Sequence, residues 1–146
     1  MASILVIDDD RAVLSTIQLL LERAAHAVEA VDHSQAGLLL LETRSFDLLI
    51  VDIFMPGMDG FETMRLVHQS WPEMPVIVIS GQQFRSASER GPDFLYMATK
   101  LGAVSSLQKP FRPHELLATV AKSLSDSPKS SEPSKATQGN TAPDRP

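Results

Sequence analysis

The chain has 146 residues, of which 43% are hydrophobic and 21% charged, a size and composition that suit one globular domain. The formal net charge of -5 argues against nucleic-acid binding, and the absence of cysteine excludes disulfides, thiolate metal sites and cysteine nucleophiles. The amino terminus has no basic segment ahead of an apolar one, and no apolar run approaches about 18 residues. We therefore expect a soluble cytoplasmic protein, with neither export nor contact with a membrane.

The first third of the chain alternates between strand and helix patterns. Residues 3–7 are an apolar run typical of a strand, and residues 11–25 place apolar side chains at helical spacing. Between them, Asp10 is positioned to cap the helix by accepting hydrogen bonds from its free backbone N–H groups. Residues 26–31 then predict a second strand, and residues 35–44 predict a second helix.

The central stretch, residues 46–53, is nearly all apolar, which predicts a strand buried on both faces. It ends with Asp52, shortly before a Pro-Gly turn. An unpaired carboxylate is costly in an apolar setting, so we expect a cation near Asp52; an aspartate that merely begins the turn is the alternative. Ser34 and Asp59 are the expected caps of the neighbouring helices. The remaining predicted elements are a helix to about residue 70, a strand at 76–79, a helix at 92–101, a strand at 104–108 and a helix from 112 to 124.

Asp8 and Asp9 lie at the end of the first predicted strand. Two adjacent carboxylates repel each other and raise a pKa unless they share a cation. Oxygen ligands of this kind favour a hard metal such as Mg²⁺. A solvated acidic loop remains the alternative for this pair.

Five strands that alternate with five helices predict an α/β protein with a doubly wound parallel sheet, and such sheets bind ligands outside the carboxyl ends of their strands. The ends of the first, third, fourth and fifth strands carry Asp8 and Asp9, Asp52, Ser80 and Lys109. Three carboxylates suit Mg²⁺, whereas a lysine and a hydroxyl suit the oxygens of a phosphoryl group. The pattern therefore predicts phosphoryl transfer onto a carboxylate, with Asp52 as the acceptor.

These features together resemble the receiver domain of bacterial two-component response regulators. The resemblance rests on the acidic pair, the segment from Asp52 to Gly60, Ser80-Gly81 and Lys109-Pro110-Phe111, and it extends over about residues 3–125. It implies a flavodoxin-like (βα)5 fold with strand order 2-1-3-4-5. It also implies that a sensor histidine kinase or a histidine phosphotransfer protein donates the phosphoryl group.

The resemblance also assigns roles to individual residues. It implies that Asp52 is the phosphoacceptor and that Asp9 binds Mg²⁺ directly. Asp8 would bind the metal directly or through water, and Phe54 would contribute its backbone carbonyl. Ser80 would hydrogen-bond to the phosphoryl group and Lys109 would pair with it. A cis peptide bond is expected before Pro110.

The sequence departs from the family at Ser106, a position that usually holds the Phe or Tyr ring of the conformational switch. Phe84 or Tyr96 could replace the aromatic ring that is missing at position 106. The simpler interpretation is that Phe84 is an aromatic residue of a loop and that Tyr96 is a core residue of a helix. The segment between Ser80 and Lys109 is also longer than is common. We therefore expect phosphorylation to be read out by an atypical, non-aromatic switch.

The same residues leave two alternative functions open. A degenerate receiver would bind partners without phosphorylation, whereas an aspartyl-phosphate hydrolase of the haloacid dehalogenase type needs a second Asp where this chain has Phe54. We expect a phosphoacceptor that assists its own phosphorylation and dephosphorylation and is not an enzyme in the ordinary sense. The receiver domain should span residues 1–125, with a disordered tail at 126–146. A stand-alone domain of this kind would act through a downstream protein target that the sequence does not identify.

Overall fold

The computed structural model describes residues 2–53, 60–80, 100 and 103–126. Within them, five parallel strands form one sheet in the order β2-β1-β3-β4-β5, which confirms the predicted fold class and strand order. The elements are β1 (Ser3–Ile7), α1 (Arg11–Arg23), β2 (Ala27–Val31), α2 (Ser34–Thr43), β3 (Leu48–Asp52), α3 (Gly60–Ser70), β4 (Val76–Ser80), β5 (Ala103–Gln108) and α5 (Pro113–Ser125).

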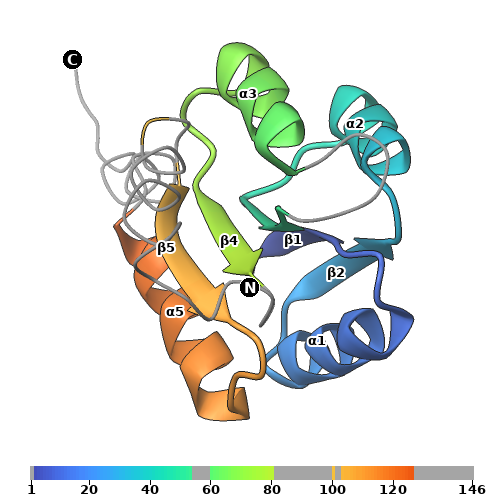
Figure 1. Ribbon diagram of the computed structural model, residues 1–146. Helices are drawn as coiled ribbons and strands as arrows, with labels where there is room; N and C mark the ends of the chain where they lie inside the picture. Colours follow the sequence, from blue (N-terminus) through green and yellow to red (C-terminus); the bar gives the residue numbers. More distant parts are fainter. Residues whose placement is uncertain (1, 54–59, 81–99, 101–102, 127–146) are drawn as a thin grey trace, which may run out of the picture.

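The sheet lies between two layers of helices, with α2 and α3 on one face and α1 and α5 on the other (Figure 1). Side chains alternate along each strand, so that Leu5 packs in the α2–α3 layer whereas Ile4 packs in the α1–α5 layer. Every residue of β3 is buried, as expected for the central strand of a sheet that is covered on both faces. These two apolar layers hold the strands in register, and they bring the strand ends together at one edge.

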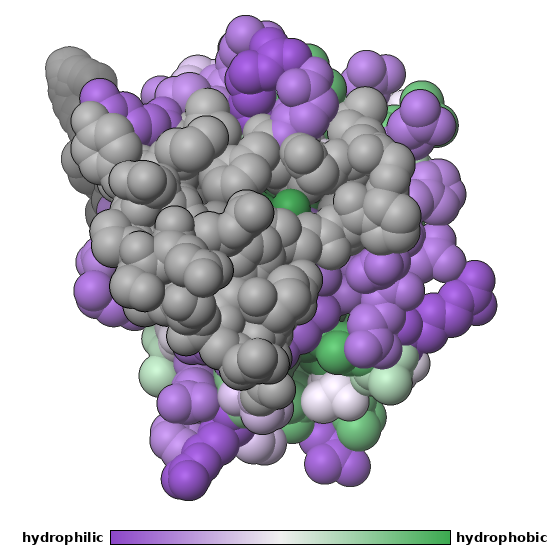
Figure 2. Space-filling model, in the orientation of Figure 1, coloured by the Kyte–Doolittle hydropathy of each residue, from purple (hydrophilic) through white to green (hydrophobic). Residues whose placement is uncertain are grey.

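In Figure 2 the coloured side chains around the grey atoms are mostly polar, and apolar groups are visible in the lower part of the view, over α1 and α5. A shallow groove of about 500 Å³ lies between α1 and the connection from β5 to α5. It is lined mainly by Ala12, Val13, Thr16, Pro110 and Phe111. The groove leads to Lys109, so it adjoins the carboxyl edge of the sheet.

The cap of α2 differs from the prediction, because His33 and not Ser34 caps this helix. The Nδ1 atom of His33 accepts a hydrogen bond from the backbone N–H of Ala36 at 3.3 Å. Ser34 lies in the first turn, only 3% exposed, and its hydroxyl accepts a hydrogen bond of 2.7 Å from the hydroxyl of Thr63 on α3. A buried hydroxyl requires a partner, and the hydroxyl of Thr63 on a neighbouring helix is such a partner for Ser34.

The first helix ends at Arg23, two residues before the predicted end at Ala25. Ala25 has a φ angle of 72°, in the left-handed region. The backbone N–H of Ala25 donates to Glu22 O, and the N–H of His26 donates to Leu21 O, each at 3.0 Å. This pair of hydrogen bonds is a Schellman motif, which usually has glycine at the left-handed position. The sequence did not predict the stop because alanine stands there instead.

Substitution of Ala25 by glycine should therefore stabilise the protein by about 0.5–1 kcal/mol, because glycine adopts positive φ angles without the steric cost of a Cβ atom. Urea unfolding of the two proteins measures the change. Ala24→Gly is the matched control, since Ala24 has a φ angle of -88°; it should be neutral or destabilising. Equal effects of the two substitutions would contradict the assignment of strain to Ala25.

Several predicted features of the fold lie outside the described residues, among them the Asp59 cap, the helix at 92–101 except for Lys100, and the tail beyond Asp126. The last described helix, α5, ends at Ser125, and Asp126 is its C-cap. Among the described helices, none has the length and apolar character needed to cross a membrane.

Candidate functional site

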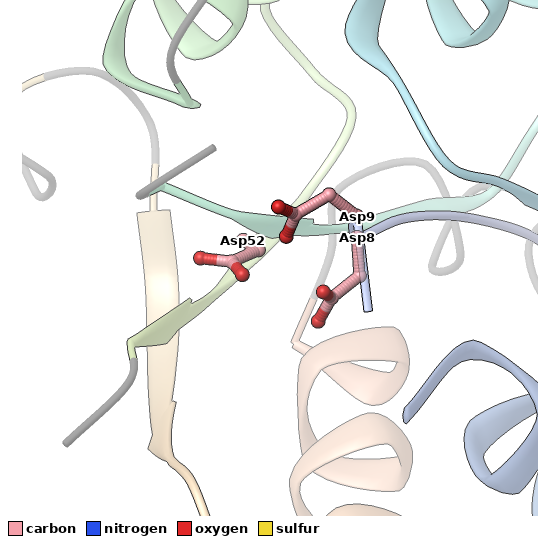
Figure 3. Close-up of side chains that lie close together, drawn as sticks. All are labelled: Asp8, Asp9 and Asp52. Atoms are coloured by element: carbon pink, nitrogen blue, oxygen red, sulfur yellow. The ribbon is translucent and has the colours of Figure 1, made fainter. Parts of the chain in front are cut away.

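The register of the parallel strands aligns the candidate residues at one edge of the sheet. Asp52 is the last residue of β3 and pairs in register with Ile79, next to Ser80 at the end of β4. Asp8 and Asp9 directly follow β1, and Lys109 directly follows β5. Figure 3 shows Asp8, Asp9 and Asp52 close together where β1 and β3 end. Each of these three carboxylates has an oxygen within 4.8 Å of an oxygen of the other two.

Lys109 is the cation of this cluster. Its Nζ lies 2.9 Å from Asp8 Oδ2 and 3.0 Å from Asp52 Oδ2. The side chains of Asp8 and Asp52 are 0% and 5% exposed, and that of Lys109 is 18% exposed. The backbone N–H of Lys109 donates to Ser80 O at 2.8 Å, which fixes the start of the loop after β5. The ammonium group is therefore held between two buried carboxylates that come from different strands.

The titration of the cluster follows from its burial. Burial is the main reason that the pKa of Asp8 is raised to about 6, and the negative charge of Asp52 adds to the rise. A hydrogen bond from the backbone of Asp10 and the contact with Lys109 lower the pKa and so oppose it. For Lys109, burial lowers the pKa, but the hydrogen bonds and charges of Asp8 and Asp52 outweigh burial, so its pKa is raised. Lys109 consequently remains charged at neutral pH.

The donor set fits a divalent cation. Asp8 Oδ2 is buried, and within the described structure its contact with Lys109 Nζ at 2.9 Å is its one polar contact. A buried oxygen in this state can still donate a lone pair to a metal. Asp9 is exposed beside it, which leaves room for the water ligands that Mg²⁺ retains. Asp8, Asp9 and Asp52 would hold the ion.

The structure brings together four of the six predicted site residues: Asp8, Asp9, Asp52 and Lys109. Ser80 ends β4 at the same edge and is partly exposed there. Phe54, whose backbone carbonyl was expected to bind the metal, lies outside the described residues. The peptide bond between Lys109 and Pro110 is cis, as expected from the resemblance.

Two contacts were not anticipated from the sequence. The backbone N–H of Asp10 donates to Asp8 Oδ1 at 2.9 Å, which orients the Asp8 carboxylate. An aspartate often accepts a hydrogen bond from the backbone two residues further on, so the Asp-Asp-Asp triplet contained a signal for this turn. The second contact is the ion pair of Lys109 with Asp8, because Lys109 was expected to face the phosphoryl group only.

The raised pKa of Asp8 predicts a specific pH dependence for the metal-free protein. Asp8 has a pKa of about 6 when folded and 3.8 as the reference value, so the folded state binds more protons between these two pH values. The contribution of Asp8 to stability is therefore fully present below about pH 4 and is lost as the pH rises through about 6.

Asp8→Asn should remove this dependence. The free energy of unfolding of the variant minus that of the wild type should increase from pH 4 to pH 7 in the presence of a chelator, because only the wild type loses stability as Asp8 ionises. Urea unfolding at a series of pH values measures the difference. Asp10→Asn, which keeps the helix cap, is the control and should show no such trend. A difference that is constant over this range would contradict the raised pKa.

This fold and this edge define a class of protein: a flavodoxin-like domain with a carboxylate cluster and a lysine at the carboxyl ends of its strands. The chain belongs to the response regulator receiver domain family, which it matches over residues 4–121. Family membership supports two-component signalling and not the hydrolase alternative.

Relatives of the chain are response regulators. It is 34% identical over 121 residues to the response regulator protein FleR of Pseudomonas aeruginosa, a match that covers 83% of this chain and 24% of FleR. It is 32% identical over 121 residues to the transcriptional regulatory protein FixJ of Bradyrhizobium diazoefficiens, a match that covers 83% of this chain and 56% of FixJ. The chain thus spans only part of the length of these curated relatives.

Solved structures of single receiver domains are similar along most of their length. A CheY-like receiver domain protein from Methanospirillum hungatei superposes with a TM-score of 0.78 at 29% identity, covering 88% of this chain and 98% of that one. A receiver domain protein from Clostridium thermocellum superposes with a TM-score of 0.74 at 31% identity, covering 86% and 95%. The fold of this chain is therefore that of the CheY-like receivers.

Proposed function

We propose that Asp52 accepts a phosphoryl group from a sensor histidine kinase or a histidine phosphotransfer protein in a Mg²⁺-dependent reaction. One observation carries the proposal: the buried carboxylate of Asp52 lies 3.0 Å from the Lys109 ammonium and beside two further carboxylates that fit a divalent cation. Membership of a family of response regulators, which are phosphorylated by histidine kinases, supports the choice of donor.

In the proposed reaction, a carboxylate oxygen of Asp52 forms a bond to phosphorus while the bond from phosphorus to the donor histidine nitrogen breaks. Mg²⁺, when bound, neutralises charge on the phosphoryl oxygens. Lys109 keeps its proton because its pKa is raised, so its ammonium can leave the acceptor oxygen and pair with a phosphoryl oxygen. Ser80, at the end of the adjacent strand, would donate a hydrogen bond from its hydroxyl group to another phosphoryl oxygen.

The same proposal covers the domain and its partners. Residues 1–125 act as a phosphoacceptor unit in the cytoplasm that promotes its own phosphorylation and dephosphorylation and transmits the signal by binding a protein, not nucleic acid. The apolar groove lined by Val13 and Phe111 adjoins Lys109, and it offers a donor protein a surface beside the acceptor.

The readout is proposed to be independent of an aromatic side chain at position 106. Ser106 is exposed on β5 and pairs in register with Val78. A serine cannot fill or vacate a ring-sized space, so a conformational signal has to use other residues. Phe84 and Tyr96, the two substitutes considered, lie outside the described residues.

Stabilisation by Mg²⁺ and transfer from a small phosphodonor test the proposal together. At a Mg²⁺ concentration ten times Kd, the free energy of unfolding should increase by about 1.4 kcal/mol. Asp9→Ala should abolish this increase, whereas Asp10→Asn should retain it, since Asp10 caps α1 and an asparagine caps equally well. Thermal unfolding with and without chelator measures the effect.

Acetyl phosphate should label the wild-type protein with a phosphoryl group only in the presence of Mg²⁺. Mass spectrometry under native conditions detects the added group. Labelling without any stabilisation by Mg²⁺ would show that the metal assignment is wrong. No labelling at saturating Mg²⁺ would favour the phosphorylation-independent binding module.

A further inference from the structure

A second hollow lies at the amino edge of the sheet, opposite the acidic cluster. It is formed by the end of α2 with the connection to β3 and by the connection from α3 to β4, and its volume is about 650 Å³. We refer to it as the Trp71 pocket; it is lined by residues 41–46 and 71–74. Since α2 and α3 lie side by side in Figure 1, the two connections that follow them meet at this edge.

The floor of the Trp71 pocket is apolar. Leu41, Phe46 and Met74 contribute to it and are 4%, 3% and 8% exposed. Trp71 is partly buried and packs against the same core cluster. The indole therefore offers part of its surface to an occupant of the pocket, and the floor offers apolar contact to an alkyl or methylene chain.

The rim of the pocket is acidic. Glu42, near the end of α2, and Glu73, in the connection from α3 to β4, are exposed and line the pocket. In the described part of the structure neither has an ion pair or a hydrogen bond. The nearby cation is already engaged, because Arg44 forms an ion pair with Glu29 and lies 5.3 Å above the ring of Phe46. The two rim carboxylates are thus available to a cation from outside.

We propose that the Trp71 pocket binds a short segment of a partner protein that presents an arginine or lysine next to an apolar residue. The cationic head would pair with Glu42 and Glu73 and lie against the Trp71 ring, while the apolar residue would cover the floor. A hollow of about 650 Å³ is several times larger than one amine head group, and it is of the size that accommodates several side-chain groups at once. This favours a polypeptide over a free amine.

The inference goes beyond the proposed function, because the pocket lies at the other edge of the sheet from Asp52. A partner bound at Glu42 and Glu73 would leave the carboxyl edge, where Asp8 and Lys109 lie, open to a phosphodonor. The domain would then be able to hold an anchoring partner and to exchange phosphoryl groups at the same time.

Trp71 is the only tryptophan of the chain, so its fluorescence reports directly on the pocket. The probe is an acetylated and amidated tetrapeptide of alternating leucine and arginine. It should change the Trp71 emission saturably, whereas the same peptide with neutral citrulline in place of arginine should not. The double variant Glu42→Gln with Glu73→Gln should bind the arginine peptide at least about tenfold more weakly.

The matched control is Glu22→Gln with Asp126→Asn, which removes the same charge from exposed positions outside the pocket. This control should bind like wild type. Equal weakening in both double variants would reveal non-specific attraction to an acidic protein and would overturn the proposal. Binding of the citrulline peptide with similar affinity would also overturn the proposal. So would binding of arginine ethyl ester as tightly as the tetrapeptide. The proposal also fails if titration with the arginine peptide changes neither the Trp71 emission nor, by calorimetry, the heat.

Discussion

Asp52→Asn should abolish phosphoryl transfer while the domain stays folded. The asparagine side chain has nearly the same shape but lacks the nucleophilic carboxylate, and loss of a nucleophile lowers the rate by at least about a thousandfold. Stability in the absence of metal should hold or rise, because Asp52 contributes to the raised pKa of Asp8 by charge repulsion. The expected variant is thus inactive and at least as stable as the wild type.

The comparison requires both measurements on the same preparations. Labelling by acetyl phosphate with Mg²⁺ gives the activity, and urea unfolding with chelator gives the stability. Asp10→Asn serves as the active control, since the Asp10 carboxylate caps α1 and an asparagine can cap the helix in its place. Retention of the label by Asp52→Asn would place the acceptor on another residue, and a large loss of stability would mean that the Asp52 carboxylate holds the fold together.

Lys109→Met should destabilise the metal-free protein by about 2–3 kcal/mol. The substitution leaves the carboxylates of Asp8 and Asp52 buried and without their shared cation, and removal of one partner from a buried ion pair costs about 3–5 kcal/mol. The expected loss of about 2–3 kcal/mol is smaller than this general cost because the Lys109 side chain is 18% exposed and because Asp8 can take up a proton. Mg²⁺ should restore part of the loss, because it supplies charge at the same oxygens.

A double-mutant cycle isolates this effect. Addition of Asp8→Asn to Lys109→Met should recover most of the lost stability, because only one carboxylate then lacks a cation. The loss should also be smaller at pH 5 than at pH 7, where Asp8 with its pKa of about 6 is ionised. Lys122→Met, on an exposed position of α5, is the control and should have little effect. Additive effects of the two substitutions would show that Asp8 and Lys109 do not depend on each other.

The two edges of the sheet would have different tasks under these proposals. The carboxyl edge concentrates charge in a buried cluster, where Lys109 and the aspartates control the chemistry of a phosphoryl group. The amino edge places an aromatic side chain and two carboxylates, unpaired within the described residues, around an apolar floor, which suits recognition rather than catalysis. Because the strands separate the two edges, a partner at one need not exclude a partner at the other.

The sequence alone determined the sheet and the place of the site. The apolar run that ends at Asp52 predicted a strand buried on both faces, and β3 is such a strand. The polar residues that follow the other strands were then expected at one edge, because parallel strands joined by helical crossovers all end on the same side. Asp8, Asp9, Asp52 and Lys109 lie there because local sequence pattern and topology are sufficient to place a strand end.

Only the tertiary structure decided which side chains contact one another at the site and around the Trp71 pocket. Lys109 reaches Asp52 across 57 residues of sequence, and Thr63 reaches Ser34 across 29, so neither contact has a local signal. The end of α1 at Arg23, with Ala25 in the left-handed region, and the formation of the Trp71 pocket likewise depend on how helices and connections pack on the sheet. Side-chain partners of this kind are selected by distance in space and by the need to satisfy buried polar groups, and a pattern along the chain does not specify either.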